Sequence, residues 1–192
     1  MVADVSAKGM DSGMVMSMTK FTMYSLIDQR LAPRDLVLKL NNLLCQQIAQ
    51  QKFISLIYAE YSGQSGDFTW AGAGHEHIIV YRAAQGDKPA NVEVIKTGGI
   101  VLGMIDNIDQ MITQQSITLN PGDRIVLYTD GVTEARNPQG DMLSLQGLVS
   151  IINGLPMLGV KEFLAAIKKK IQAYIQDAAR YDDITLVVLG RD

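Results

Sequence analysis

From residue 53 to residue 130 the chain alternates between short strand-like segments and turn-forming sequences, and this alternation limits the fold more than any other feature. The strand-like segments are FISLIYAEY (53–61), which is rich in β-branched and aromatic residues, FTWAGAG (68–74), HIIVYR (77–82), VEVI (92–95), MITQQSITL (111–119) and RIVLYTD (124–130). Turn sequences such as SGQSG (62–66) and NPGD (120–123) lie between them. Connections this short join antiparallel neighbours, so the pattern predicts a mainly antiparallel sheet. The nearly continuous apolar run at 124–130 predicts a strand that is buried on both faces.

A methionine-rich helix is predicted before the strands, over about residues 10–29. Apolar side chains recur there at helical spacings of four and three, namely Met10, Met14, Met18 and Phe21, with Val15 and Leu26 beside them. We expect this face to be pliable core. The alternative is a surface that repacks around a partner.

Two further helices are predicted, one on either side of the strands. The first begins at Pro33, which is favoured at a first helical position, and carries Asp35 in its first turn. Its buried stripe is Leu36, Leu40, Leu44 and Ile48, and that of the late helix is Phe163, Ile167, Ile171, Tyr174 and Ile175. A final strand follows at ITLVVL (184–189). This order of elements predicts a single α+β domain.

Charge and composition exclude several classes of protein. Lys and Arg number 17 against 20 Asp and Glu, and this net charge of −3 argues against a nucleic-acid-binding protein. The lone Cys45 and two histidines exclude an internal disulfide and a cysteine-rich zinc site. No apolar run approaches the roughly 18 residues of a membrane span, and no signal peptide is evident. We therefore expect a cytoplasmic protein with no membrane span.

Aspartates at predicted strand ends are the candidates for chemistry. Asp4 precedes the first helix, Asp130 ends the segment 124–130, and Asp182 and Asp183 open the last strand. Carboxylates without a histidine or cysteine partner form an all-oxygen site, which suits Mg²⁺ or Mn²⁺. A pair of such ions can activate water and hold a phosphoryl group. The alternative is structural, because Asp is common in Asp-Gly turns and at helix N-termini.

Five blocks, in collinear order from Asp4 to Leu189, resemble one known family. They are DVSAKG (4–9), WAGAGHEHIIVYR (70–82), GGIVLGM (98–104), PGDRIVLYTDGVTEARNPQGD (121–141) and YDDITLVVL (181–189). The sequence resembles the bacterial stage II sporulation protein E branch of the metal-dependent (type 2C) Ser/Thr protein phosphatases. The resemblance implies an αββα sandwich, that is, two mainly antiparallel β-sheets flanked by helices.

The same resemblance implies an activity and partners. We expect hydrolysis of phosphoserine or phosphothreonine on a signalling protein by water activated by one or two Mn²⁺ or Mg²⁺ ions. The expected substrate is an anti-sigma-factor antagonist. An upstream sensor or receiver domain in the parent chain and a homodimer are the other expected partners.

Site residues are carried over position by position. The resemblance implies that Asp4 bridges two ions and that the backbone carbonyl of Val5 is a further ligand. Asp130 and Asp182 would bind the first ion, and Asp183 is a second candidate at the same place. These three aspartates, Asp4, Asp130 and Asp182, would be the catalytic residues.

Two neighbouring positions have implied supporting roles. Lys8, beside Asp4 in the sequence, is a candidate for binding the substrate phosphate. Gly131 is expected to adopt a positive φ in the tight turn that aims Asp130, since glycine does so without a steric penalty.

Departures from the family pattern keep a second hypothesis open. The upstream strands with their acidic motif are absent before Met1, so we expect residues 1–192 to be a single phosphatase-like domain without these N-terminal strands and without a regulatory domain. Ala7 also replaces the usual glycine. These features favour a catalytically weak or inactive binding or adaptor module. Three mutually repelling carboxylates favour the enzyme, because cations are needed to neutralise them. His75 and His77 are two residues apart and would share one face of a strand, where they could bind a metal. We expect them instead to make ordinary hydrogen bonds.

Overall fold

The structure is a computed structural model that describes residues 1–6, 9–47, 52–179 and 182–192. The chain forms two compact units. The first unit comprises Met1–His75 and Thr97–Thr118, and the second comprises Glu76–Lys96 and Leu119–Asp192. The chain therefore crosses between the units three times, and each unit is described by itself.

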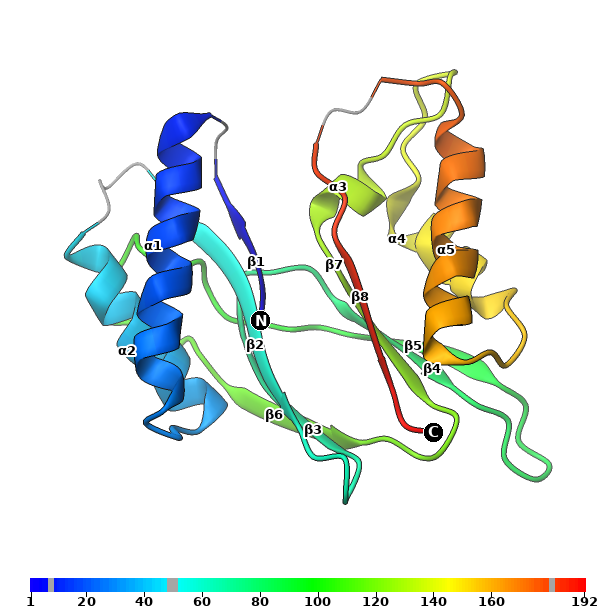
Figure 1. Ribbon diagram of the computed structural model, residues 1–192, viewed down its shortest axis with the longest axis horizontal. Helices are drawn as coiled ribbons and strands as arrows, with labels where there is room; N and C mark the ends of the chain where they lie inside the picture. The colour runs from blue at the N-terminus through cyan, green and yellow to red at the C-terminus, as the bar shows by residue number, and fades with distance from the viewer. Residues whose placement is uncertain (7–8, 48–51, 180–181) are drawn as a thin grey trace. The chain divides into compact units, whose positions relative to one another are not determined.

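The first unit contains a four-stranded sheet in the order β1-β2-β3-β6, antiparallel throughout (Figure 1). Its strands are β1 (Val2–Val5), β2 (Ile54–Tyr61), β3 (Asp67–Ala73) and β6 (Gln114–Thr118). Helices α1 (Met10–Ile27) and α2 (Pro33–Cys45) pack on one face. Val5, Ile54 and Leu56 face these helices within one buried apolar cluster. Because side chains alternate along a strand, Asp4 and Ser55 lie on the opposite face.

The second unit contains a four-stranded antiparallel sheet in the order β5-β4-β7-β8. Its strands are β4 (Ile78–Arg82), β5 (Asn91–Ile95), β7 (Arg124–Tyr128) and β8 (Leu186–Gly190), and its helices are α3 (Asp130–Thr133), α4 (Ser144–Asn153) and α5 (Val160–Ile175). Tyr81 and Phe163 join sheet and helix, with ring centroids 5.3 Å apart. Every residue of β7 is buried, as the apolar run at 124–130 predicts.

The predicted fold class is confirmed, since both sheets are antiparallel and helices flank them. Pro33 opens α2, and the predicted stripes of α2 and α5 are buried where they are described, except that Tyr174 is only partly buried. Ile48 lies outside the described residues.

Several predicted boundaries are wrong. The strand at 124–130 ends at Tyr128, because Asp130 begins α3. The last strand begins at Leu186 rather than at Ile184, so Asp182 and Asp183 lie in the segment before it. The strand at 111–119 is shorter, because Met111 belongs to a turn in which its N–H donates to the Ile108 carbonyl at 2.9 Å. β1 and α4 were not predicted.

The apolar face that predicted the first helix is not core. Met10 and Phe21 are 84% and 70% exposed, and Met14 and Tyr24 are exposed beside them. The buried side of α1 is instead Ser12, Val15, Thr19, Met23 and Leu26. Apolar residues occupy both sides of α1, so periodicity alone could not select the side that packs on the sheet.

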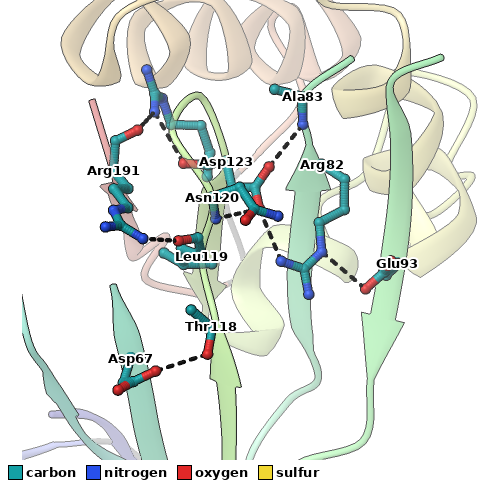
Figure 2. A network of polar contacts seen from close by, with 10 residues as sticks. Asp67, Arg82, Ala83, Glu93, Thr118, Leu119, Asn120, Asp123 and Arg191 are labelled. Atoms are coloured by element: carbon teal, nitrogen blue, oxygen red, sulfur yellow. Dashed lines mark hydrogen bonds and ion pairs between the residues drawn. The ribbon is translucent and has the colours of Figure 1, made fainter. Parts of the chain in front are cut away.

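The Asn120–Asp123 turn is held by a buried carboxylate in the second unit (Figure 2). Asp123 accepts from Arg82 Nη1 and from the backbone N–H groups of Ala83 and Asn120, each at 2.9 Å. Arg82 Nε also donates to Glu93 at 3.3 Å. The aspartate of the PGD block is therefore structural, because it joins the turn to β4.

None of the helices in the described part of the chain is long and apolar enough to cross a membrane.

Candidate functional site

Asp130 lies where β7 passes into α3 in the second unit. Thr129 is extended at φ −94° and precedes the helix, whose first residue is Asp130. The Asp130 carbonyl accepts from the Glu134 N–H at 2.8 Å and from the Thr133 hydroxyl at 3.1 Å. These bonds fix the backbone of Asp130 and leave its half-buried carboxylate uninvolved in the turn itself.

Thr129 ties this turn to the segment that precedes β8. Its hydroxyl donates to the Asp183 carbonyl at 3.2 Å and accepts from the Thr185 N–H at 3.1 Å. Its own N–H donates to the Thr185 carbonyl at 3.2 Å. The Thr129 side chain therefore fixes the backbone around Asp183, which is more than 50 residues away in the sequence. This contact places the Asp183 segment beside the turn that begins with Asp130.

Gly131 sits in contact with the same segment. A Cβ at this position would collide with the Asp183 carbonyl oxygen and would lie 3.5 Å from Cβ of Asp182. Gly131 is not among the residues with positive φ, so the predicted reason for glycine is wrong. The residue is glycine because two backbones approach closely, and this approach brings Asp130, Asp182 and Asp183 to one end of the second sheet.

Substituting Gly131 by alanine should therefore destabilise the second unit. The added methyl group forces the Asp182–Asp183 segment away from the turn, at a cost of about 1–3 kcal/mol, as for other overpacked sites. Urea unfolding would measure the loss, with Gly63→Ala as the control, because a Cβ there would meet nothing within 4 Å and the residue has no positive φ. Unchanged stability in Gly131→Ala would contradict the close-approach argument.

Asp182 and Asp183 are exposed. The Asp183 N–H donates to Oδ1 of Asp182 at 2.8 Å, which restrains the Asp182 side chain. Their carboxylates therefore lie at the surface, beside a turn whose backbone is held in place.

Asp4 belongs to the first unit, on β1. It pairs with Ser55 of β2, and Val5 pairs with Ile54. The chain turns after β1 through Ser6, whose Oγ accepts from the Phe53 N–H at 2.9 Å and whose carbonyl accepts from the Ser12 hydroxyl at 3.3 Å. Asp4 and Val5 therefore lie on the regular strand β1, at the edge of its sheet, and Val5 is the last residue of that strand. Lys8 and Ala7 lie outside the described residues.

Ser55 contacts a histidine that the aspartate pattern did not identify as part of the site. Ser55 Oγ lies 2.8 Å from Nδ1 of the buried His75. The AGH sequence at the end of β3 marks this histidine, but the sequence contains no sign that it reaches Ser55. His77 belongs to the second unit, so the two histidines do not form a pair within either one.

Cys45 has the character of a structural thiol. Its Sγ lies 3.5 Å from the Ile105 carbonyl and 3.7 Å from Asn41 Oδ1. Burial, followed by the Asp106 carboxylate, raises the pKa of the Cys45 thiol. A raised pKa disfavours the thiolate, which is the nucleophilic form.

The donor set suits a hard divalent cation. The predicted ligands Asp4, Asp130, Asp182 and Asp183 provide carboxylates, and Val5 provides a carbonyl, so every donor is oxygen. Asp4 lies in the first unit and the other aspartates lie in the second. Among the described residues, no group of three or more His, Cys, Asp or Glu side chains is already gathered around one point.

Two antiparallel sheets with flanking helices are the fold of type 2C phosphatase domains among solved structures. The SiaA-PP2C domain of Pseudomonas aeruginosa has this fold, with a TM-score of 0.77 at 15% identity over 99% of this chain and 73% of that one. The catalytic domain of the serine/threonine protein phosphatase PstP, in complex with two manganese ions, has a TM-score of 0.65 at 12% identity, covering 97% of this chain and 84% of that one. The αββα class is confirmed.

The chain belongs to the stage II sporulation protein E (SpoIIE) family, whose model matches residues 1–192. It is 33% identical over 190 residues to the phosphoserine phosphatase RsbU of Bacillus subtilis (strain 168). This match covers 99% of the chain but 54% of RsbU, so the chain spans about half the length of that relative. The family resemblance that the five sequence blocks indicate is confirmed.

Proposed function

We propose that this chain is the catalytic domain of a metal-dependent protein phosphatase that hydrolyses phosphoserine or phosphothreonine on a signalling protein. The observation that carries the proposal is the attachment of the Asp182–Asp183 segment to the Asp130 turn through Thr129 and Gly131. The attachment brings the Asp182–Asp183 backbone beside the Asp130 turn, and carboxylates that approach one another repel unless a cation neutralises them, as an enzyme's metal site would do. The identity to a phosphoserine phosphatase supports the same conclusion.

Asp4, Asp130 and Asp182, with Asp183 as a second candidate, and the Val5 carbonyl would hold one or two Mn²⁺ or Mg²⁺ ions. When bound, such ions lower the pKa of a bound water and neutralise phosphoryl charge. Thr129 and Gly131 keep the Asp130 backbone in place, so the turn would need little reorganisation when Asp130 binds an ion. Lys8 is the proposed contact for the substrate phosphate.

The proposed substrate is a phosphorylated anti-sigma-factor antagonist in the cytoplasm, as the family resemblance implies. Since RsbU is about twice as long as the match, an upstream sensor or receiver domain is the proposed source of regulation in the parent protein. The proposed domain organisation is one phosphatase-like domain over residues 1–192.

Hydrolysis by the 192-residue chain tests the proposal. We expect Mn²⁺-dependent release of phosphate from p-nitrophenyl phosphate and from a phosphoserine peptide, and no release after chelation with EDTA. Binding of the phosphopeptide without turnover, at any Mn²⁺ concentration, would instead favour the adaptor module.

The exposed apolar face of α1 supports the proposed homodimer. Met10, Met14, Phe21 and Tyr24 lie within one narrow sector of the helix and are all exposed. Large apolar side chains gathered and exposed on one side of a helix are typical of an interaction site. We expect sedimentation equilibrium to give twice the 21.0 kDa mass of the chain, and the double substitution Met14→Gln with Phe21→Gln to return the monomer.

Met157→Gln is the matched control, because Met157 is also an exposed methionine but lies in the second unit. A wild-type chain that stays monomeric would contradict the homodimer. A dimer that survives the double substitution would show that α1 is not its interface.

A further inference from the structure

A buried histidine in the first unit lies beside the strand pair that carries Asp4. The His75 side chain is 7% exposed. Nδ1 of its ring is 2.8 Å from Ser55 Oγ, which is hydrogen-bonding distance for either direction of donation. None of the roles proposed for the metal ligands or for Lys8 uses this contact.

The backbone of His75 is held by the segment Thr97–Gly98, which packs against the end of β3. Its carbonyl accepts from the Thr97 hydroxyl at 2.6 Å, and the preceding Gly74 N–H donates to the Gly98 carbonyl at 3.2 Å. A Cβ on Gly72 would lie 2.5 Å from the Thr97 carbonyl oxygen, so backbone approaches backbone directly here. The ring is therefore presented to Ser55 by a closely packed backbone.

Ser55 is the direct cross-strand neighbour of Asp4. Residues paired across antiparallel strands point to the same face, with Cβ atoms about 4.5–5.5 Å apart. A serine hydroxyl and an aspartate carboxylate at this separation can meet. The register thus places Asp4 beside Ser55 on the sheet face opposite α1 and α2, and Ser55 in turn contacts His75.

We propose that His75 is a positioning residue for Asp4 and acts through Ser55. His75 Nδ1–H donates to Ser55 Oγ, and the Ser55 hydroxyl, which thereby keeps its own proton available, donates to the Asp4 carboxylate. If Ser55 instead donated its proton to His75 Nδ1, only the lone pairs of Ser55 Oγ would face Asp4, and the hydroxyl could not donate to the carboxylate. Outer partners of this kind orient metal-ligating carboxylates. The inference rests on the proposed function, because it assigns the orientation of a proposed metal ligand.

The ring tautomer tests the direction of donation without metal or turnover. Long-range ¹H–¹⁵N NMR of the metal-free chain should show His75 protonated at Nδ1, and assignment is simple because the chain has two histidines. In Ser55→Ala the Nδ1 proton has lost its acceptor, so a shift toward the Nε2-protonated form is expected. A wild-type ring that is protonated only at Nε2 would overturn the proposal.

Calorimetric titration with Mn²⁺ tests the consequence for Asp4. Ser55→Ala and His75→Gln should each weaken Mn²⁺ affinity by about 10–100-fold. The double variant should bind Mn²⁺ no more weakly than the weaker of the two single variants, because both side chains act through the same contact. His75→Asn should recover most of the affinity, since the asparagine amide nitrogen stands as many bonds from Cα as Nδ1 does.

Ser116→Ala is the matched control, because Ser116 is an exposed serine on β6 of the same sheet. Its Mn²⁺ affinity should equal that of the wild type. If the wild-type chain binds Mn²⁺ and Ser55→Ala binds it equally well, the positioning role alone fails. If the wild-type chain binds no Mn²⁺, the proposed function fails and takes this inference with it.

Discussion

Asp130→Asn should lower Mn²⁺-dependent hydrolysis of a phosphoserine peptide by more than about 100-fold. Loss of an outer partner of a metal ligand costs roughly 10–100-fold, and a carboxylate that binds the ion directly should cost more. Asparagine keeps the shape of the side chain. The hydrogen bonds that α3 makes at this position use the Asp130 backbone carbonyl and therefore survive.

The meaning of that result depends on separating metal binding from folding. Asp141→Asn is the control, because Asp141 is an exposed carboxylate in the same sequence block. Its activity should remain close to that of the wild type. Both variants should unfold at the wild-type urea concentration when metal is absent. An Asp130→Asn enzyme with wild-type turnover would remove Asp130 from the site.

Asp123→Asn should destabilise the chain more than Gly131→Ala does. The Asp123 side chain is 1% exposed and accepts from Arg82, Ala83 and Asn120. Removing its charge takes the buried carboxylate out of its pair with the half-buried Arg82 guanidinium and turns an amide group toward N–H donors, and breaking a buried pair in this way costs about 3–5 kcal/mol. For a chain of this size that corresponds to a fall in Tm of roughly 6–20 °C.

Glu93→Gln is the control for this substitution because it removes the other carboxylate of the same guanidinium. The Glu93 side chain is 43% exposed, and its Arg82 contact is longer, at 3.3 Å. Its loss should cost less than about 1 kcal/mol, as for most surface ion pairs. Equal losses from both substitutions, measured by urea unfolding, would show that burial does not distinguish the two carboxylates.

The same PGD block illustrates how far a motif can be interpreted from the sequence. Asn120–Asp123 was correctly predicted as a turn, because proline and glycine restrict or widen the backbone locally, and Gly122 does adopt a φ of +91°. The role of Asp123 could not be predicted in this way. Its partner Arg82 lies 41 residues earlier, and only the β4–β7 register brings the two together.

The helix at the start of the chain shows the same limit. Its existence follows from local spacing, and the structure confirms it. Its core side does not, because both Val15 and Phe21 belong to plausible apolar faces and only the position of the sheet decides between them. The exposed methionines were therefore assigned to the wrong side.

The candidate site divides in the same way. Motif order proposes Asp4, Asp130 and Asp182 as ligands, whereas the reason for glycine at 131 is its close approach to the Asp183 carbonyl, which no local pattern indicates. The contact between Ser55 and His75 had no sequence signal, because it joins the ends of two strands.

The sequence by itself determined the family, the α+β class and the identity of the candidate ligands, since these depend on motifs and on periodicity between near neighbours. The tertiary structure decided which face of α1 is covered, why residue 131 has no side chain, what holds Asp123 and which histidine contacts Ser55. Each of these depends on contacts between segments far apart in the chain, where pairing register and backbone approach, rather than local preference, set the free energy.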